Sequence, residues 1–417
     1  MAARLLAGPW TLDGITAAID AVVGPMRPRI RAELATSVLA LAEDTYPPSP
    51  RALSSFLTEA QAFRPPRRRP IPAVLDPPRF APITPFANIE LPAIATIGAL
   101  AAWLNTSVEQ LDWLADLRQS HEREASAGLR HYRYALIPKG DGSVRLLEAP
   151  KPRLKAIQRR ILTDILARVP VHDRAMGFVR GRSCLRAASI HAGEAVVVTF
   201  DLCRFFPSIA RPRIYGMFRG YPWAVAWRLA GLCTTATSRA IRDRLPEGQE
   251  TYGLPHLPQG APTSPALANL LAWRLDQRLD RLARVAEANY ARYADDLAFS
   301  GDAAFAAELA RFSKSVETIV SDEGFTLKHA KTRVMPRQRR QTVVGIVVNE
   351  HCNISRNDFD ALKAILFNCM QHGPAGQNRA GVADFRRHLD GRVTWVEQVN
   401  PARGAKLRAL FDRIAWD

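Results

Sequence analysis

The sequence has few cysteines, no long apolar run, and few acidic residues relative to its basic ones. Its five cysteines form no Cys-x-x-Cys pair, so they predict neither a zinc knuckle nor a disulfide framework and are typical of a reducing compartment. No stretch of 18 apolar residues occurs, and the N-terminus lacks the apolar core of a signal peptide. We therefore expect a cytoplasmic protein with no membrane span.

The excess of basic residues is the first positive indication of function. Among 417 residues, 57 Lys and Arg oppose 40 Asp and Glu, a formal net charge of +17. This balance favours nucleic acid as a partner, although a basic surface can also serve solubility alone. Arg outnumbers Lys, and the guanidinium group suits phosphate best. The apolar fraction of 47% is ordinary for a globular protein and allows a sizeable core.

Prolines divide the chain into regions. We expect an N-terminal helical region over residues 1–45, in which two helical segments fall within 12–44, and a Pro- and Arg-rich linker over 46–90. Residues 46–86 hold eleven prolines, which remove backbone donors and stop helices. Mixed helix and strand patterns then occupy 91–350, and helical periods dominate 351–417.

Three carboxylates lie in segments that can bring them together. Asp201 lies near the end of the β-branched, apolar stretch 195–202, which predicts a buried strand. Asp295 and Asp296 lie in "YARYADDLAFSG", which predicts a strand, a turn and a strand, and alternation along the strand predicts that Asp296 turns partly away. Three converging carboxylates suit two Mg²⁺ ions about 3.5–4 Å apart in phosphoryl transfer. Alternatively, Asp201 caps a turn and the acid pair is only a polar turn.

From about residue 105 onward the sequence resembles the reverse transcriptases, and specifically the retron-type bacterial enzymes. "YADD" at 293–296 matches their Tyr-x-Asp-Asp box, "FDLCRFFPSI" at 200–209 the first catalytic box, and "LPQGAPTSPALANL" at 257–270 the third. The resemblance implies an α+β right-hand polymerase fold, with fingers and palm over 91–350 and a helical thumb over 351–417. It implies an RNA-directed DNA polymerase that uses two Mg²⁺ ions. The implied catalytic residues are Asp201, Asp295 and Asp296, which would bind metal together with Leu202.

The resemblance also implies contacts to the incoming deoxynucleoside triphosphate. The matching positions are Lys139, Arg145, Phe206, Gln259, Gly260 and Lys331. Lys139 and Arg145 would grip the triphosphate, and Phe206 would exclude a ribose 2′-OH. Lys331 would lie near the triphosphate and could act as general acid to the pyrophosphate. Each also has an ordinary structural interpretation: the cations could be solvated strand residues, and Phe206 could pack in the core.

Two boxes typical of retron enzymes are each present with one departure. "AASIH" at 187–191 has Ala187 in place of Asn, and "VVG" at 343–345 has Val344 in place of Thr. These departures would equally suit a related defence-type reverse transcriptase. His191 could contact RNA or be a structural histidine. The positions predicted to contact RNA or template are His191, Arg182, Gly345, Arg386, Arg392 and Lys406, the last three on a thumb that would track a duplex backbone.

The resemblance further implies the partners. A retron enzyme would use a cognate structured non-coding RNA as primer and template and copy it into RNA-linked single-stranded DNA. Such systems serve antiphage defence, often with an effector protein, and the N-terminal helices could bind the effector or the RNA. The chain has no room for maturase, endonuclease or RNase H domains, so we expect a host RNase H to remove RNA. Two alternatives stay open: a defence-type or group II intron-related reverse transcriptase without a retron RNA, and a non-catalytic RNA-binding protein on a polymerase fold.

Overall fold

The computed structural model forms two compact units, Met1–Arg79 and Phe80–Asp417, which are treated separately. The structure describes residues 11–23, 28–41, 89–117, 129–138, 140 and 142–416, together with residues 5, 53, 56, 57 and 60. Most of the predicted linker, and Lys139, lie outside the described residues. None of the described helices combines the length and apolar character that a bilayer crossing needs.

The first unit contains two short helices, α2 (Leu12–Val23) and α3 (Pro28–Leu39). Pro28 begins α3, where the missing proline N–H removes no helical hydrogen bond. Apolar side chains of both helices form a small buried core that includes Ile15, Ile19, Leu34, Ala35 and Val38. The two helical segments expected within residues 12–44 are therefore confirmed.

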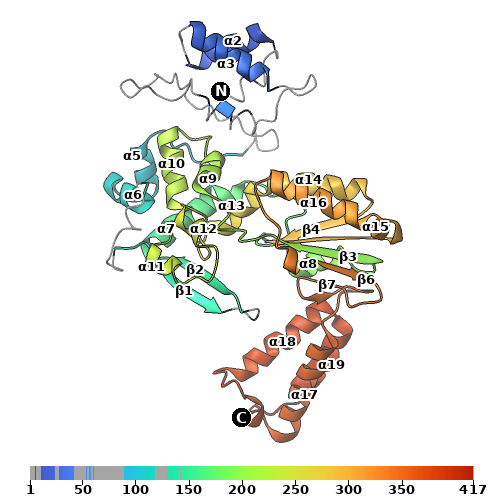
Figure 1. Cartoon of the computed structure of the whole chain (residues 1–417). Helices are drawn as coiled ribbons and strands as arrows, with labels where there is room; N and C mark the ends of the chain where they lie inside the picture. The colour runs from blue at the N-terminus through green and yellow to red at the C-terminus, as the bar shows by residue number, and fades with distance from the viewer. Residues whose placement is uncertain are drawn as a thin grey trace. The chain divides into compact units, whose positions relative to one another are not determined.

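The centre of the second unit is a four-stranded antiparallel sheet in the order β4-β5-β3-β6 (Figure 1). Its strands are β3 (Val196–Asp201), β4 (Asn289–Tyr293), β5 (Asp296–Gly301) and β6 (Arg333–Pro336). Strands β4 and β5 form a tight hairpin, and β3 pairs with β5 on one side and β6 on the other. The predicted strand at 195–202 and the predicted hairpin at 290–301 are both confirmed.

Both faces of this central sheet are covered, which explains the nearly unbroken apolar sequence of β3. Val198 and Phe200 belong to the larger core, to which α14 (Trp273–Val285) and α16 (Leu309–Asp322) contribute. Val197 points to the opposite face and joins a second core. Because side chains alternate along a strand, a strand buried on both faces cannot show polar alternation.

A second region of this unit combines a β-hairpin with helices that come before and after β3 in the chain. Strands β1 (Tyr132–Pro138) and β2 (Val144–Pro150) pair antiparallel, as expected around the turn that includes Lys139. The helices of this region that belong to the larger core are α5 (Ile97–Trp103), α6 (Val108–Ala115), α7 (Pro152–Asp164), α9 (Arg211–Met217) and α10 (Trp223–Leu232). Shorter helical elements in the second unit are η4 (Leu166–Arg168), α8 (Cys184–Ser189), α11 (Arg239–Arg242), α12 (Gln249–Gly253), α13 (Ser264–Leu271), α15 (Ala303–Ala307), η5 (His329–Lys331) and η6 (Ala375–Gln377).

The C-terminal part is helical, as the sequence predicts. It consists of α17 (Arg356–His372), α18 (Phe385–Val399) and α19 (Pro401–Phe411), and a two-stranded hairpin, β7 (Thr342–Val343) and β8 (Ile346–Val347), precedes it. The second core joins these helices to the hairpin and to the central sheet through Leu362, Leu389, Val393 and Leu407 on the helices, Val343 and Ile346 on the hairpin, and Val197 and Met335 on the sheet. The helices are therefore anchored to the sheet face opposite α14 and α16.

Candidate active site

The strand register brings the three predicted acids to one end of the central sheet. Asp201 ends β3, and Asp296, the first residue of β5, lies directly opposite it. Asp295 lies in the β4–β5 turn, and its carbonyl oxygen accepts a hydrogen bond from Leu202 N at 2.9 Å. Directly opposed residues share one face of a sheet, so Asp296 lies on the same side as Asp201. The register therefore aligns Asp296 with Asp201 more closely than strand alternation alone predicts.

Burial and neighbouring acids raise the pKa values of Asp295 and Asp296. Burial, followed by the charges of Asp295 and Asp201, raises the pKa of Asp296 to about 6. Burial and the charge of Asp201 also raise the pKa of Asp295. Lys331 partly compensates this charge: its Nζ lies 2.7 Å from Asp201 Oδ2, and this hydrogen bond raises the pKa of Lys331. The cluster therefore holds more negative charge than its surroundings balance.

The donor atoms at this point suit a hard divalent cation, which prefers oxygen ligands. Among the described residues, no three His, Cys, Asp or Glu side chains already stand close enough to hold a metal by themselves. Metal ions in phosphoryl transfer complete their coordination with substrate phosphates and water. Three converging carboxylates with unbalanced charge fit that kind of shared site. The Leu202 side chain carries no oxygen or nitrogen atom, so only its main-chain carbonyl could contribute.

Two aromatic rings lie near the β4–β5 turn, and the Phe178 ring centroid is 6.5 Å from that of Tyr293. Phe206 is half-buried, and its ring centroid lies 5.6 Å from that of Phe205 and 5.9 Å from that of Phe178. Phe206 thus packs against the core and still presents one side, so both interpretations of this residue can hold. Phe178, which sequence reasoning missed, is 52% exposed and has a φ of +62°. A bulky side chain at positive φ is unusual, and this backbone strain is the structural feature that distinguishes Phe178.

The other predicted nucleotide contacts surround β2. Arg145 is exposed on β2, and its positive charge makes a minor contribution that opposes the rise in the pKa of Asp295. Gln259 has a buried Oε1 atom without a hydrogen-bond partner in the described part of the chain. Gly260 has a φ of +128°, and a Cβ there would lie 3.0 Å from Glu148 O. The backbone that comes close to Gly260 is therefore that of strand β2. Lys139 lies outside the described residues.

His191 is a structural histidine, so its predicted RNA contact is wrong. The residue is 0% exposed, and its Nδ1 lies 2.8 Å from Ser300 Oγ. Burial, with a smaller effect of the Arg174 charge, lowers the pKa of His191 to about 3 and keeps the ring neutral. A buried neutral ring cannot reach a phosphate or a base.

The other positions predicted to contact RNA differ in their exposure and in their hydrogen bonds within the protein. Arg182 donates hydrogen bonds to two carbonyl oxygens of its own loop, at 2.6 and 2.7 Å, and its RNA contact stays a prediction. Gly345 lies exposed in the β7–β8 turn with a φ of +83°. On the C-terminal helices, Arg386 and Lys406 are exposed and Arg392 is half-buried. These four positions stay predictions.

An antiparallel sheet with carboxylates at the ends of two neighbouring strands, covered by helices, is the arrangement expected of a right-hand nucleic-acid polymerase. The family described as "Reverse transcriptase (RNA-dependent DNA polymerase)" matches residues 137–348. The retron Mx65 reverse transcriptase of Myxococcus xanthus is 40% identical over 331 residues, which are 77% of this chain and 72% of that protein. The retron Mx162 reverse transcriptase of the same organism is 37% identical over 332 residues, which are 76% of this chain and 66% of that protein.

Among solved structures, a foamy viral protease–reverse transcriptase in complex with double-stranded DNA covers 97% of this chain and 60% of its own length, with 13% identity and a TM-score of 0.35. So low a score adds nothing to the assignment. The family match and the retron relatives are decisive: the chain belongs to the reverse transcriptases, and it is a retron-type RNA-directed DNA polymerase. The predicted α+β right-hand fold and the predicted enzyme class are confirmed.

Proposed function

We propose that this enzyme copies a cognate structured non-coding RNA of a retron into RNA-linked single-stranded DNA. The observation that supports this proposal most is the 40% identity to a retron reverse transcriptase over 77% of the chain. The template and primer would be the same RNA, which primes from one of its own 2′-hydroxyl groups. The large positive charge, +17, suits such a partner.

In this proposal Asp201, Asp295 and Asp296 are the catalytic acids and hold two Mg²⁺ ions, with Leu202 contributing its main chain. Bound metal would lower the pKa of the attacking hydroxyl and neutralise charge on the leaving pyrophosphate. Lys331 already pairs with Asp201 and its side chain is 42% exposed, so it can also reach a triphosphate beside that acid. Its raised pKa favours a role as a fixed positive charge over a role as general acid.

The substrate contacts follow from the residues around the acids. Arg145 on β2 and Lys139, which lies outside the described residues, would grip the triphosphate, and Phe206 would select a deoxyribose. The free Oε1 of Gln259 would accept a hydrogen bond from nucleotide or template, since a buried oxygen without a donor is unfavourable unless a ligand supplies one. The exposed cations of α18 and α19, Arg386 and Lys406, would follow the backbone of the product duplex.

The partners beyond nucleic acid belong to the same proposal. We infer a role in antiphage defence, an effector protein as partner, and a host RNase H that trims the template. A second candidate is a defence-type reverse transcriptase without a retron RNA. The departures at Ala187 and Val344 within the two retron boxes would equally suit this candidate.

The test is to sequence the nucleic acid that copurifies with the chain when it is expressed together with its flanking DNA. We expect one short DNA of constant sequence that is linked to RNA and migrates faster after ribonuclease treatment. The matched control is the double variant Asp295→Asn/Asp296→Asn, which should retain RNA but carry no DNA. If wild type carries DNA from many templates, or none that is joined to RNA, the second candidate is favoured and the retron proposal fails.

A further inference from the structure

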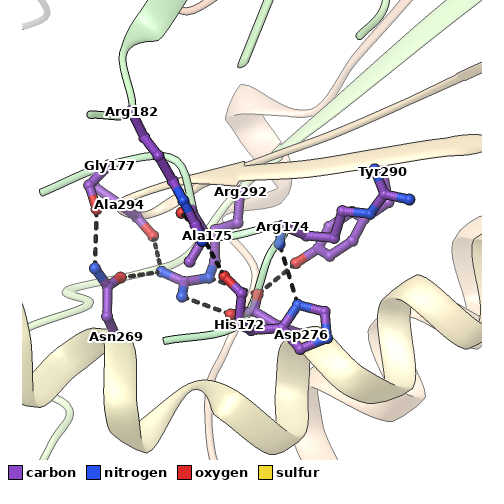
Figure 2. Close-up of polar contacts among 10 residues, drawn as sticks. All are labelled: His172, Arg174, Ala175, Gly177, Arg182, Asn269, Asp276, Tyr290, Arg292 and Ala294. Atoms are coloured by element: carbon purple, nitrogen blue, oxygen red, sulfur yellow. Dashed lines mark hydrogen bonds and ion pairs between the residues drawn. The ribbon is translucent and has the colours of Figure 1, made fainter. Parts of the chain in front are cut away.

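A charged side chain, Arg292, lies fully buried directly beneath the catalytic turn. Arg292 belongs to β4, two residues before Ala294 of the YADD box, and is 0% exposed. An arginine taken out of water is unfavourable unless its charge and its N–H groups are matched. Figure 2 shows that Arg292 lies at the centre of a group of polar side chains drawn from several elements of the fold.

Asp276 of α14 balances this charge. Arg292 Nε and Nη2 each donate to one carboxylate oxygen of Asp276 at 2.7 Å, a bidentate pair in which both side chains are 0% exposed. Tyr290 of β4 donates its hydroxyl to the same carboxylate at 2.8 Å. Burial alone would lower the pKa of Arg292, but Asp276 outweighs burial and raises it. The guanidinium is therefore permanently charged and fixed in orientation.

The third nitrogen of the guanidinium reaches the catalytic turn itself. Arg292 Nη1 donates to the carbonyl oxygen of Ala294 at 3.0 Å and to Asn269 Oδ1 at 3.0 Å. Ala294, the variable residue of the YADD box, has a φ of +58°, a conformation that residues other than glycine rarely adopt. The hydrogen bond from Arg292 holds this strained residue, and the next residue in the chain is Asp295.

A loop packs on the other side of the same turn. A Cβ added at Gly177 would lie 2.6 Å from Ala294 N, so the loop backbone touches the turn directly. Asn269 of α13 donates from Nδ2 to Gly177 O at 2.9 Å, and Arg292 O accepts from Met176 N at 2.7 Å. One amide therefore links the buried guanidinium to the loop that covers the turn (Figure 2).

We propose that Arg292, oriented by Asp276, is a positioning residue that fixes the YADD turn so that Asp295 and Asp296 are presented together to metal and substrate. Asn269 transmits the same constraint to the loop that carries Gly177. Arg292 acts through the Ala294 carbonyl, to which it donates, and not through the acids themselves. The inference rests on the catalytic role proposed above for the two acids.

An alternative is that the pair serves stability only, as any buried ion pair could. A purely structural role and a positioning role differ in what a conservative change affects. Lysine keeps the charge but cannot make the bidentate contact and reach the Ala294 carbonyl at the same time. Arg292→Lys should therefore leave a folded chain with a loosely held turn, in which the metal-binding acids are misplaced.

The test compares Arg292→Lys with a matched control at the far end of the same strand. In the control, Asn289→Ala, the variant loses a 2.8 Å hydrogen bond from Nδ2 to Glu194 Oε1 but leaves the turn untouched. Both variants are measured by thermal unfolding and by RNA-templated primer extension at several Mg²⁺ concentrations. For Arg292→Lys we expect a kcat about 10–100-fold lower, a higher Mg²⁺ concentration for half-maximal rate, and an unchanged KM for primer–template. For Asn289→Ala we expect a shift in thermal midpoint alone.

If Arg292→Lys shifts only the thermal midpoint, as the control does, the positioning role is refuted. If Arg292→Lys does not fold, the variant Asn269→Asp provides the test. This variant keeps an acceptor for Arg292 but loses the donor to the Gly177 carbonyl. A normal Mg²⁺ dependence at normal stability would refute the role of Asn269 and with it the proposal. The proposed function fails separately, when Asp295→Asn/Asp296→Asn extends a primer as fast as wild type.

Discussion

The buried pair of Glu148 and His256 allows a prediction in which the two partners behave differently. Glu148 Oε2 lies 3.0 Å from His256 Nε2, and the side chains are 0% and 1% exposed. His256 Nδ1 faces Leu254 O at 2.7 Å, and Glu148 Oε1 accepts from Thr237 Oγ1 at 2.6 Å. Both ring nitrogens therefore face acceptors. Burial alone would lower the pKa of His256, but the charge and hydrogen bond of Glu148 outweigh it and raise the pKa.

The magnitude follows from which atoms keep a partner after each substitution. In Glu148→Gln, the amide N–H can donate to Nε2 of a neutral His256 and the amide oxygen can still accept from Thr237, so we expect a loss of less than about 1 kcal/mol. In His256→Phe, the Glu148 carboxylate loses its positive partner while it stays buried, and breaking such a pair costs about 3–5 kcal/mol. We therefore predict that His256→Phe loses more free energy of unfolding than Glu148→Gln.

The sign of the pH dependence follows from the raised pKa of His256. Its contribution to stability is fully present below the unfolded pKa of about 6.5 and is lost as pH rises through the higher folded pKa. The stability advantage of wild type over Glu148→Gln should therefore shrink above pH 6.5. Urea denaturation between pH 6 and 9 measures this. Equal losses for the two variants, or an advantage that grows with pH, would refute the reasoning.

Two further predictions concern substrate contacts. Phe206→Ala should raise the incorporation of ribonucleotides relative to deoxynucleotides by about 10-fold or more, measured by single-nucleotide insertion, and an unchanged ratio would count against the gate. Arg386→Gln and Lys406→Gln should each lower the slope of log affinity against log salt by about 0.9 for duplex binding, because each removes one phosphate contact. Arg408→Gln is the matched control: the guanidinium of Arg408 on α19 already pairs with two acids of the neighbouring helix α18, at 2.6 and 2.9 Å, so the slope should stay unchanged. An equal fall in all three slopes would contradict the assignment of the two exposed cations.

The elements that the sequence predicts correctly are those whose signal is local. The strand at 195–202 is buried on both faces, so its apolar run is unbroken, and the hairpin at 290–301 is a single local unit. Pairing across long stretches of sequence leaves no such signal. Lys331 and Asp201 are 130 residues apart, and only the folded chain brings their side chains to 2.7 Å.

The site residues that sequence reasoning assigned wrongly or missed have buried partners. His191 received its RNA interpretation from a box, but its environment is set by Ser300, 109 residues away. Arg292 stands in the quoted hairpin, yet alternation along β4 says nothing about its partner Asp276, 16 residues earlier on α14. A usable signal did exist: Asp276 follows the buried Leu275 on the apolar face of that helix, and a buried acid requires a buried base.

The most direct test of the account is RNA-templated primer extension by wild type and by Asp295→Asn/Asp296→Asn, with deoxynucleotides and Mg²⁺. Removing the carboxylates should remove several kcal/mol of charge stabilisation. The rate of the double variant should therefore be at least about 10³-fold lower than that of wild type. The double variant should remain folded, because neutral amides avoid both the burial of charge and the repulsion between acids that together raise the pKa of Asp296 to about 6. We predict extension by wild type that a chelator stops, and almost none by the variant. Equal extension by a folded variant and wild type would contradict the account.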